Sequence, residues 1–318
     1  MVKIALAGGS GNVASEIIDA LVATGKHEIV IFTGKDVDAQ KASSGITWIK
    51  TDYEDTNQLA KALEGVHTLL SFVTEQELQT SPIQRRLIDA AVQAGVKRFS
   101  PSEWATSRFD HLPWYAYKAD IRQYLADLNK EKKVLEYTFF TPGLFTNYFT
   151  RPYKSSKHIH QLETPIDFET RRAILVEGRD NGLITLTTAQ DLAAIVAKAI
   201  EYEGEWPVVS GIRGSRLTIG ELIKIGEKVR GGKPFTIDRV KAEDFERGEW
   251  QTSWLPVVDH PSIPKDQLEA FGKIGVQGLS LAFSGGSFDV SDEWNQLLPD
   301  YKFTQAQEFL EEIWKGKP

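Results

Sequence analysis

Cysteine is absent from this chain of 318 residues, and methionine occurs only once. The absence of cysteine excludes disulfides, thiolate metal sites and a cysteine nucleophile. No apolar run approaches the roughly 20 residues that a membrane-spanning helix needs. Basic residues are also in deficit, because 37 lysines and arginines stand against 44 acidic residues, for a net charge of −7. This balance argues against a polyanion-binding surface. We therefore expect neither a nucleic-acid partner nor a membrane partner.

A targeting peptide is also not expected, because a strand-like apolar run begins at Val2. Hydrophobic residues make up 41% of the chain and charged residues 25%, which is ordinary for a globular protein. Together with the absence of cysteine, these features favour a cytoplasmic protein. The length suggests about two domains.

The first fourteen residues organise the chain. The apolar run from Val2 to Ala7 is typical of a strand buried on both faces, and a helical pattern begins at Val13. Between them, Gly9-x-Gly11-x-x-Ala14 fits the dinucleotide fingerprint, and Gly8-x-x-Gly11-x-x-Ala14 fits the spacing of extended short-chain reductases. A strand, a glycine turn and a helix N-terminus together form an anion site. The alternative is a glycine turn that only packs a helix tightly against a sheet.

Strand and helix patterns then alternate over the first part of the chain. This alternation is typical of an α/β fold with a doubly wound parallel sheet, in which ligands bind at the carboxyl ends of the strands. We expect a Rossmann-type NAD(P)-binding domain over residues 1–152, which residues 185–212 rejoin, and a second, smaller α+β substrate-binding domain over residues 153–318. Further strands are predicted at residues 27–32, 46–50, 66–73, 96–100 and 137–141, and helices at residues 55–63 and 82–94.

The end of the second predicted strand decides the choice of cofactor. An acidic side chain there binds the ribose of NAD, whereas a basic one accommodates the 2′-phosphate of NADP. Here Thr33 and Lys35 come first, and no carboxylate occurs until Asp36. This order favours NADP(H). The alternative is that Lys35 is an ordinary solvated lysine beside a non-selective site.

A helix opened by Pro113 carries a lysine with possible chemistry. Tyr117, Ile121 and Leu125 form its buried stripe, and Lys118 lies beside that stripe near the helix N-terminus. The positive helix end and partial burial both disfavour an ammonium group, so the pKa of Lys118 would fall toward the range useful for proton transfer. From spacing alone, a solvated surface lysine is the alternative interpretation.

Several segments that span most of the chain match the pattern of one protein family, and they are Gly8–Val13, Val96–Trp104, Tyr117–Arg122, Tyr137–Phe145 with Tyr148 and Phe149, and Leu298–Thr304. With these segments the sequence resembles the NmrA-like group of atypical short-chain reductases, and within it the isoflavone reductase-like proteins. One segment departs from the pattern, because Trp104 follows Glu103 where the family has phenylalanine.

The resemblance implies an NADP(H)-dependent enzyme, a monomer or homodimer, that reduces a small aromatic or related metabolite. The family's active-site lysine falls on Lys118. Position 114 is tryptophan, so the common Tyr-x-x-x-Lys pair is missing, and Tyr115 and Tyr117 are out of register. This departure favours a lysine-centred mechanism over carbonyl reduction with a tyrosine acid.

The candidate site residues fall into two groups besides the catalytic Lys118. The cofactor-binding candidates are Gly8, Ser10, Gly11, Asn12, Val13, Thr33, Lys35, Phe72, Ser100, Lys118, Pro142 and Phe145. The substrate-lining candidates are Trp104, Tyr117, Phe145, Tyr148 and Phe149, although each aromatic could instead be a core residue. We expect no metal site, because His158-x-His160 lacks a third ligand nearby.

The sequence thus predicts an NADPH-dependent reductase of a small aromatic or conjugated metabolite, with Lys118 as proton shuttle. Two rival functions use the same fold. One is a non-catalytic NAD(P)-sensing regulatory protein of the NmrA-like type. The other is a redox-neutral dehydratase or isomerase.

Overall fold

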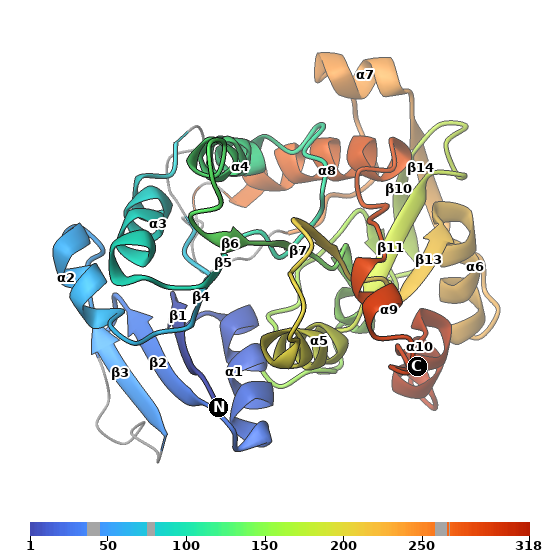
Figure 1. The fold of residues 1–318 in the computed structure, drawn as a ribbon. Helices are drawn as coiled ribbons and strands as arrows, with labels where there is room; N and C mark the ends of the chain where they lie inside the picture. The colour runs from blue at the N-terminus through green and yellow to red at the C-terminus, as the bar shows by residue number, and fades with distance from the viewer. Residues whose placement is uncertain (37–44, 75–79, 258–265, 267) are drawn as a thin grey trace. The chain divides into compact units, whose positions relative to one another are not determined.

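A computed structural model of the chain describes residues 1–36, 45–74, 80–257, 266 and 268–318 (Figure 1). The chain forms two compact units, each assembled from separate stretches of sequence. Unit 1 comprises Met1–Trp104, Trp114–Thr141 and Leu192–Gly211, and unit 2 comprises Ala105–Pro113, Pro142–Asp191 and Ile212–Pro318. Within the described ranges, no helix is both long enough and apolar enough to cross a membrane.

Unit 1 is built on a six-stranded parallel sheet with the strand order β3-β2-β1-β4-β5-β6 (Figure 1). The order runs outward in both directions from β1, which is the doubly wound arrangement and confirms the predicted Rossmann-type α/β fold. The strands are β1 (Lys3–Ala7), β2 (Glu28–Thr33), β3 (Ile46–Lys50), β4 (Thr68–Ser71), β5 (Arg98–Ser100) and β6 (Glu136–Tyr137).

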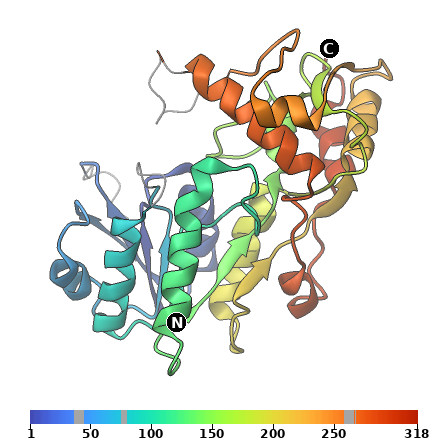
Figure 2. The ribbon, with the colours of Figure 1, turned by 90° about the horizontal axis from the view of Figure 1, so that it is seen from above.

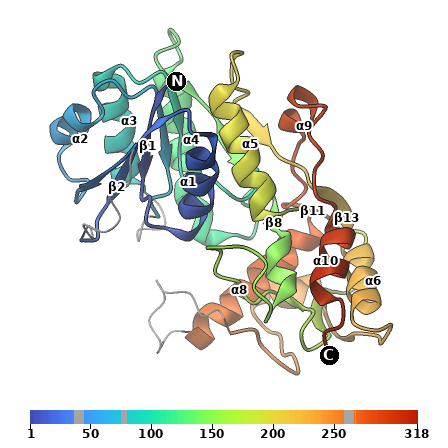
Figure 3. The same ribbon diagram turned by 90° about the horizontal axis from the view of Figure 1, so that it is seen from below.

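Helices cover both faces of this sheet. Helices α2, α3 and α4 lie on one face, whereas α1 and α5 lie on the other (Figures 1, 2 and 3). The central strand β1 is therefore buried on both sides: Ala5 and Ala7 pack in the core under α2–α4, and all residues from Ile4 to Ala7 are fully buried. The helices are α1 (Asn12–Thr24), α2 (Thr56–Ala62), α3 (Pro82–Ala94), α4 (Ala116–Leu128) and α5 (Ala189–Glu201), the last belonging to unit 1 from Leu192 onward.

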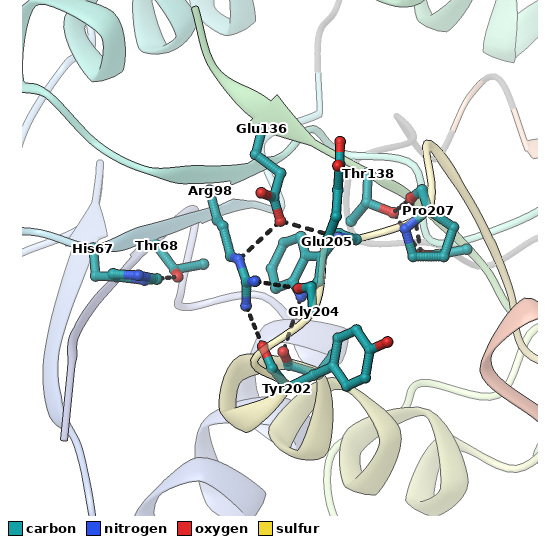
Figure 4. A network of polar contacts seen from close by, with 12 residues as sticks. His67, Thr68, Arg98, Glu136, Thr138, Tyr202, Gly204, Glu205 and Pro207 are labelled. Atoms are coloured by element: carbon teal, nitrogen blue, oxygen red, sulfur yellow. Dashed lines mark hydrogen bonds and ion pairs between the residues drawn. The ribbon is translucent and has the colours of Figure 1, made fainter. Parts of the chain in front are cut away.

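The buried Arg98 fixes the chain after α5 to the sheet of unit 1 (Figure 4). Its Nη1 donates to the carbonyl of Tyr202 at 2.7 Å, and its Nη2 donates to the carbonyl of Gly204 at 2.6 Å. Its Nε lies 2.9 Å from Oε1 of Glu136, which also accepts the backbone N–H of Trp206 at 3.0 Å. A guanidinium that satisfies two carbonyls and a carboxylate is a strong cross-link, because each bond involves a charge.

The expected strand over residues 137–141 is divided into β6 and β7 (Phe139–Thr141). At the break, the Thr138 hydroxyl contacts the Pro207 carbonyl at 2.6 Å and the Ser210 hydroxyl at 2.5 Å. Strand β7 then pairs in parallel with β12 (Val209–Gly211), so that the chain after α5 adds a strand beside it.

Unit 2 contains two small three-stranded sheets, ordered β14-β10-β9 and β13-β11-β8. One of its cores joins β10, β14, α7 and α8 through Ile174, Val240, Phe245 and Val276. A capping box of Thr218 and Glu221 opens α6. The elements are β8 (Leu144–Phe145), η3 (Thr146–Thr150), β9 (Ile166–Asp167), β10 (Arg172–Val176), β11 (Leu183–Thr187), β13 (Ser215–Thr218), α6 (Ile219–Val229), β14 (Thr236–Val240), α7 (Ala242–Arg247), α8 (Leu268–Ser284), α9 (Glu293–Leu297) and α10 (Ala306–Trp314).

Candidate active site

The glycine turn after β1 needs its glycines. Gly8 has a φ of +72°, and a Cβ there would lie 3.0 Å from the backbone of Phe72. A Cβ on Gly9 would lie only 2.4 Å from Cγ2 of Ile31. The turn therefore lies directly against β2 and the end of β4, with no room for side chains at either position.

Helix α1 begins immediately after this turn. Gly11 is its N-cap residue and makes no side-chain capping bond, and the first turn contains no acidic residue. Asn12 and Val13 are the first two helical residues, with Asn12 exposed and Val13 half-buried. The first amides of a helix have no acceptor within it, so this helix start offers donors and a positive dipole end to an anion.

Tyr53, which sequence reasoning missed, supports the glycine turn. Its hydroxyl accepts the backbone N–H of Gly8 at 2.9 Å, and burial raises the pKa of Tyr53 to about 12. Tyr53 has a φ of +63° and follows the end of β3. Because the two residues are 45 positions apart, no local pattern connects them.

The end of β2 lies beside the glycine turn. The Thr33 hydroxyl donates to the Ser10 hydroxyl at 3.2 Å and accepts the backbone N–H of Lys35 at 3.1 Å. The Lys35 side chain is exposed. Asp36, the first carboxylate after the strand, forms an ion pair with Lys50 at the end of β3, and this contact lowers the pKa of Asp36. The hydroxyls of Ser10 and Thr33 therefore connect the glycine turn to the end of β2, and Lys35 follows them in the chain.

Lys118 lies in the first turn of α4, after the 3₁₀ turn η2 (Pro113–Tyr115), and is 5% exposed. Its Nζ donates to the carbonyl of Ser102 at 2.9 Å and to the carbonyl of Glu103, and lies 4.4 Å from the Tyr115 ring centroid. Burial lowers the pKa of Lys118 to about 8, the Glu103 carboxylate opposes this shift, and the Arg122 guanidinium adds to it. The side chain is thus a buried amine rather than a solvated lysine.

Trp104 forms the centre of a stack of aromatic rings. Its ring lies 4.4 Å from that of Phe72 with an interplanar angle of 7°, and 5.4 Å from that of Phe140 with an angle of 11°. Its Nε1 donates to the carbonyl of Ser71, the last residue of β4, at 2.7 Å. Trp104 also has a φ of +41°, so the stack and this bond hold a residue in a conformation that side chains disfavour.

Two other candidates from the sequence lie in the same unit. Ser100 is buried at the end of β5, and its hydroxyl donates to the Pro101 carbonyl at 3.3 Å. Tyr117 is buried on α4, with its ring centroid 5.8 Å from Nζ of Lys118. Unit 1 therefore brings Lys118 and Tyr117 together beside the loop that follows β5.

The remaining candidates belong to unit 2. Pro142 and Phe145 are buried, and Phe145 meets the half-buried Tyr148 edge-on at 5.7 Å between ring centroids. Phe149 is buried and packs on Phe168 at 5.2 Å. Within this unit, Phe145 and Tyr148 form one aromatic pair and Phe149 contacts another part of the core.

Comparisons with known proteins agree with the fold. The family model described as the NmrA-like family matches residues 2–256. Oxidoreductase BOA1 of Botryotinia fuckeliana is 29% identical, with 97% of this chain and 100% of that protein covered. An isoflavone reductase-like protein of Olea europaea is 24% identical, with 98% of each chain covered. The solved structure of NADPH-dependent quinone oxidoreductase QOR2 of Escherichia coli, complexed with NADPH, has a TM-score of 0.70 at 22% identity, covering 98% of this chain and 100% of that one.

Proposed function

The chain belongs to the NmrA-like family, as its sequence motifs indicated, and we propose that it is an NADPH-dependent reductase of a small aromatic or conjugated metabolite. The observation that carries this proposal is Lys118, a buried amine held by two backbone carbonyls beside the carboxyl end of β5. Perturbed titratable groups beside a ligand-binding edge are typical of catalytic sites. The oxidoreductase names of the relatives support the same reaction class.

The residues at the carboxyl ends of β1 and β2 fit NADPH. The turn at Gly8 and the free amides of Asn12 and Val13 would hold the pyrophosphate, because they leave space and offer donors. The hydroxyls of Ser10 and Thr33, with Lys35 beside them, would hold the 2′-phosphate. Asp36, the first carboxylate after β2, forms an ion pair with Lys50.

When bound, the cofactor would supply a hydride to an electrophilic carbon of the substrate. Lys118 can supply the proton. Two N–H bonds of its Nζ point to the Ser102 and Glu103 carbonyls in either protonation state. Only the third position on Nζ therefore changes when the proton is lost. That position carries an N–H in the ammonium form and a lone pair in the amine form. With a pKa of about 8, both forms are populated near neutral pH. Lys118 would therefore donate to the oxyanion that hydride transfer creates and then be reprotonated from solvent.

The aromatic side chains are the basis of the proposed substrate class. Trp104, at the centre of the ring stack, and the buried Tyr117 would contact a flat, apolar substrate. Phe145, Tyr148 and Phe149 are proposed as further substrate contacts. Phe72 and Ser100, beside the ends of β4 and β5, would contact the nicotinamide, and Pro142 is proposed as a further cofactor contact.

NADPH consumption against a panel of quinones, aromatic enones and aromatic ketones tests the proposal. We expect turnover by the wild type and a loss of about 100-fold or more in kcat for Lys118→Ala, the range that general acid catalysis supplies. Lys97→Ala, at an exposed position of the same unit, is the matched control and keeps full activity. Full activity of Lys118→Ala on a true substrate would exclude the proposed role of Lys118.

Two other outcomes would favour the rival functions. Tight NADPH binding without turnover of any compound would indicate a sensor of the cofactor. Conversion of a compound without NADPH consumption, followed by mass spectrometry of the product, would indicate a dehydratase or an isomerase.

A further inference from the structure

The loop that holds Lys118 is itself tightly fixed. The backbone N–H of Glu103 donates to the Pro101 carbonyl at 2.8 Å, and the backbone N–H of Ser102 donates to Oε1 of Gln84 on α3 at 3.1 Å. Ser102 is 5% exposed and Glu103 is 2% exposed. The two carbonyls that accept from Lys118 therefore project from a loop whose amides already have partners.

The side chain of Glu103 makes a second connection to the same helix. Its carboxylate, 1% exposed, binds Arg122 in a two-pronged ion pair, with Nε to Oε1 at 2.9 Å and Nη2 to Oε2 at 2.6 Å. Arg122 follows Lys118 by four residues and so lies one turn further along the same face of α4. Its guanidinium also lies 5.2 Å from the Phe139 ring centroid. A planar, two-pronged pair restricts the orientation of both groups.

Glu103 thus contacts both cations of α4, with its carbonyl on Lys118 and its carboxylate on Arg122. We propose that Glu103 and Arg122 are positioning residues that hold the two carbonyls against Lys118 and set its protonation without touching the reacting atoms. The proposal deepens the proposed function, and rests on it for the role of Lys118 as proton donor. The contacts of the pair stand independently of that role.

The two charges of the pair act on Lys118 in opposite directions. The Glu103 carboxylate raises the pKa of Lys118, whereas the Arg122 guanidinium lowers it. The groups that face Lys118 are Glu103 from the loop after β5, Tyr115 from η2, and Tyr117 and Arg122 from α4. Burial raises the pKa of Tyr115, so its phenol stays neutral near neutral pH and adds no charge beside Lys118. Removing either charge of the pair therefore leaves the other one unopposed.

The test is the pKa of Lys118 measured directly, by NMR titration of the full chain labelled with ¹³C-lysine, with the Lys118 signal assigned through Lys118→Arg. We expect Glu103→Gln to lower the pKa of Lys118 and Arg122→Gln to raise it, each by about one pKa unit, the lower end of the range for a nearby charge. A general loosening of the loop would instead move both variants in the same direction, because it would readmit water to the amine.

Asp120→Asn is the matched control. Asp120 lies on the same helix and forms a comparable two-pronged pair with Arg85 of α3, with Nε to Oδ2 at 3.0 Å, without being among the groups that face Lys118. We expect the pKa of Lys118 in Asp120→Asn to equal its value in the wild type. Opposite shifts in the two variants with an unchanged control support the proposal, whereas unchanged or parallel shifts overturn it. If Arg122→Gln does not fold, Glu103→Gln decides alone, and an unchanged or raised pKa overturns the proposal.

The titration also separates the positioning role from the proposed function. Opposite pKa shifts in a protein that consumes no NADPH would support the positioning role of Glu103 and Arg122 and would exclude the proposed reductase function. Turnover in variants whose Lys118 pKa does not move would retain the reductase and reject the pair. If both the positioning role and the reductase activity are present, the alkaline limb of the pH profile of kcat/KM shifts together with the Lys118 pKa measured by NMR. It moves to lower pH in Glu103→Gln and to higher pH in Arg122→Gln.

Discussion

Replacing Lys118 by methionine, a side chain of similar length without charge, should change how the stability of the protein depends on pH. Lys118 has a pKa of about 8 in the folded chain against an ordinary value of 10.5, because burial penalises the ammonium form. The unfolded chain therefore binds more protons at this residue between these two pKa values. Stability consequently rises with pH in that interval, and the burial of Lys118 is most unfavourable below pH 8.

The size of the effect follows from the difference of about 2.5 units between the two pKa values, at about 1.4 kcal/mol per unit. At low pH, the buried ammonium lowers the free energy of unfolding by about 3 kcal/mol relative to a neutral amine. Between pH 7 and pH 9.5, about 2 kcal/mol of this should be recovered. Methionine has no titration of its own. Lys118→Met also loses the two hydrogen bonds of Nζ, about 1 kcal/mol each, and this cost is the same at every pH.

The measurement is urea unfolding of the wild type and of Lys118→Met at several pH values between 7 and 9.5. The difference in free energy of unfolding between the two proteins should change by about 2 kcal/mol, in favour of the wild type as pH rises. All other titrating groups cancel in this difference. A difference that stays constant over the interval would refute the reasoning, because it would mean that the folded chain does not depress the pKa of Lys118.

Three further predictions concern the proposed cofactor site. Lys35→Glu should weaken NADPH binding about tenfold or more while leaving NADH binding within a few-fold, by fluorescence titration, and equal effects on both cofactors would contradict the assignment of Lys35 to the 2′-phosphate. Tyr53→Phe should lower the free energy of unfolding by about 1–3 kcal/mol, because the Gly8 N–H loses its acceptor, and an unchanged urea midpoint would show that this bond contributes nothing. Gly9→Ala should cost about 1–3 kcal/mol in the same assay, because its Cβ would overlap Ile31, and an unaltered stability would show that β2 can move away.

The fold could be predicted because its signals are local. The run from Ile4 to Ala7 has the density of a strand buried on both faces, and each later helix carries an apolar stripe. Glycines at the helix ends are equally local signals, and Gly25 and Gly95 indeed cap α1 and α3 in the left-handed conformation. The division of residues 137–141 into two strands was missed, because it depends on contacts of Thr138 with a segment about 70 residues away.

The candidate site could be predicted only where one segment contains the whole feature. The glycine turn is such a feature. Burial of Lys118 was only a hypothesis, because its acceptors lie 15 and 16 residues earlier and nothing in the helix pattern specifies them. The same reason explains why Tyr53 and the pairing of Glu103 with Arg122 were missed, since each depends on a partner from another element.

The cross-link at Arg98 has a consequence for synthesis and truncation. The sheet of unit 1 has its six strands once residue 137 is made, yet the carbonyls that satisfy Arg98 come from Tyr202 and Gly204. A chain stopped near residue 152 would leave that guanidinium short of partners and β7 as an open edge without β12. Residues 1–152 alone therefore lack part of unit 1, which also includes Leu192–Gly211. The last segment of unit 1 ends at Gly211, about two thirds of the way along the chain. During synthesis, strands β8 to β11 of unit 2 are therefore made before unit 1 is complete.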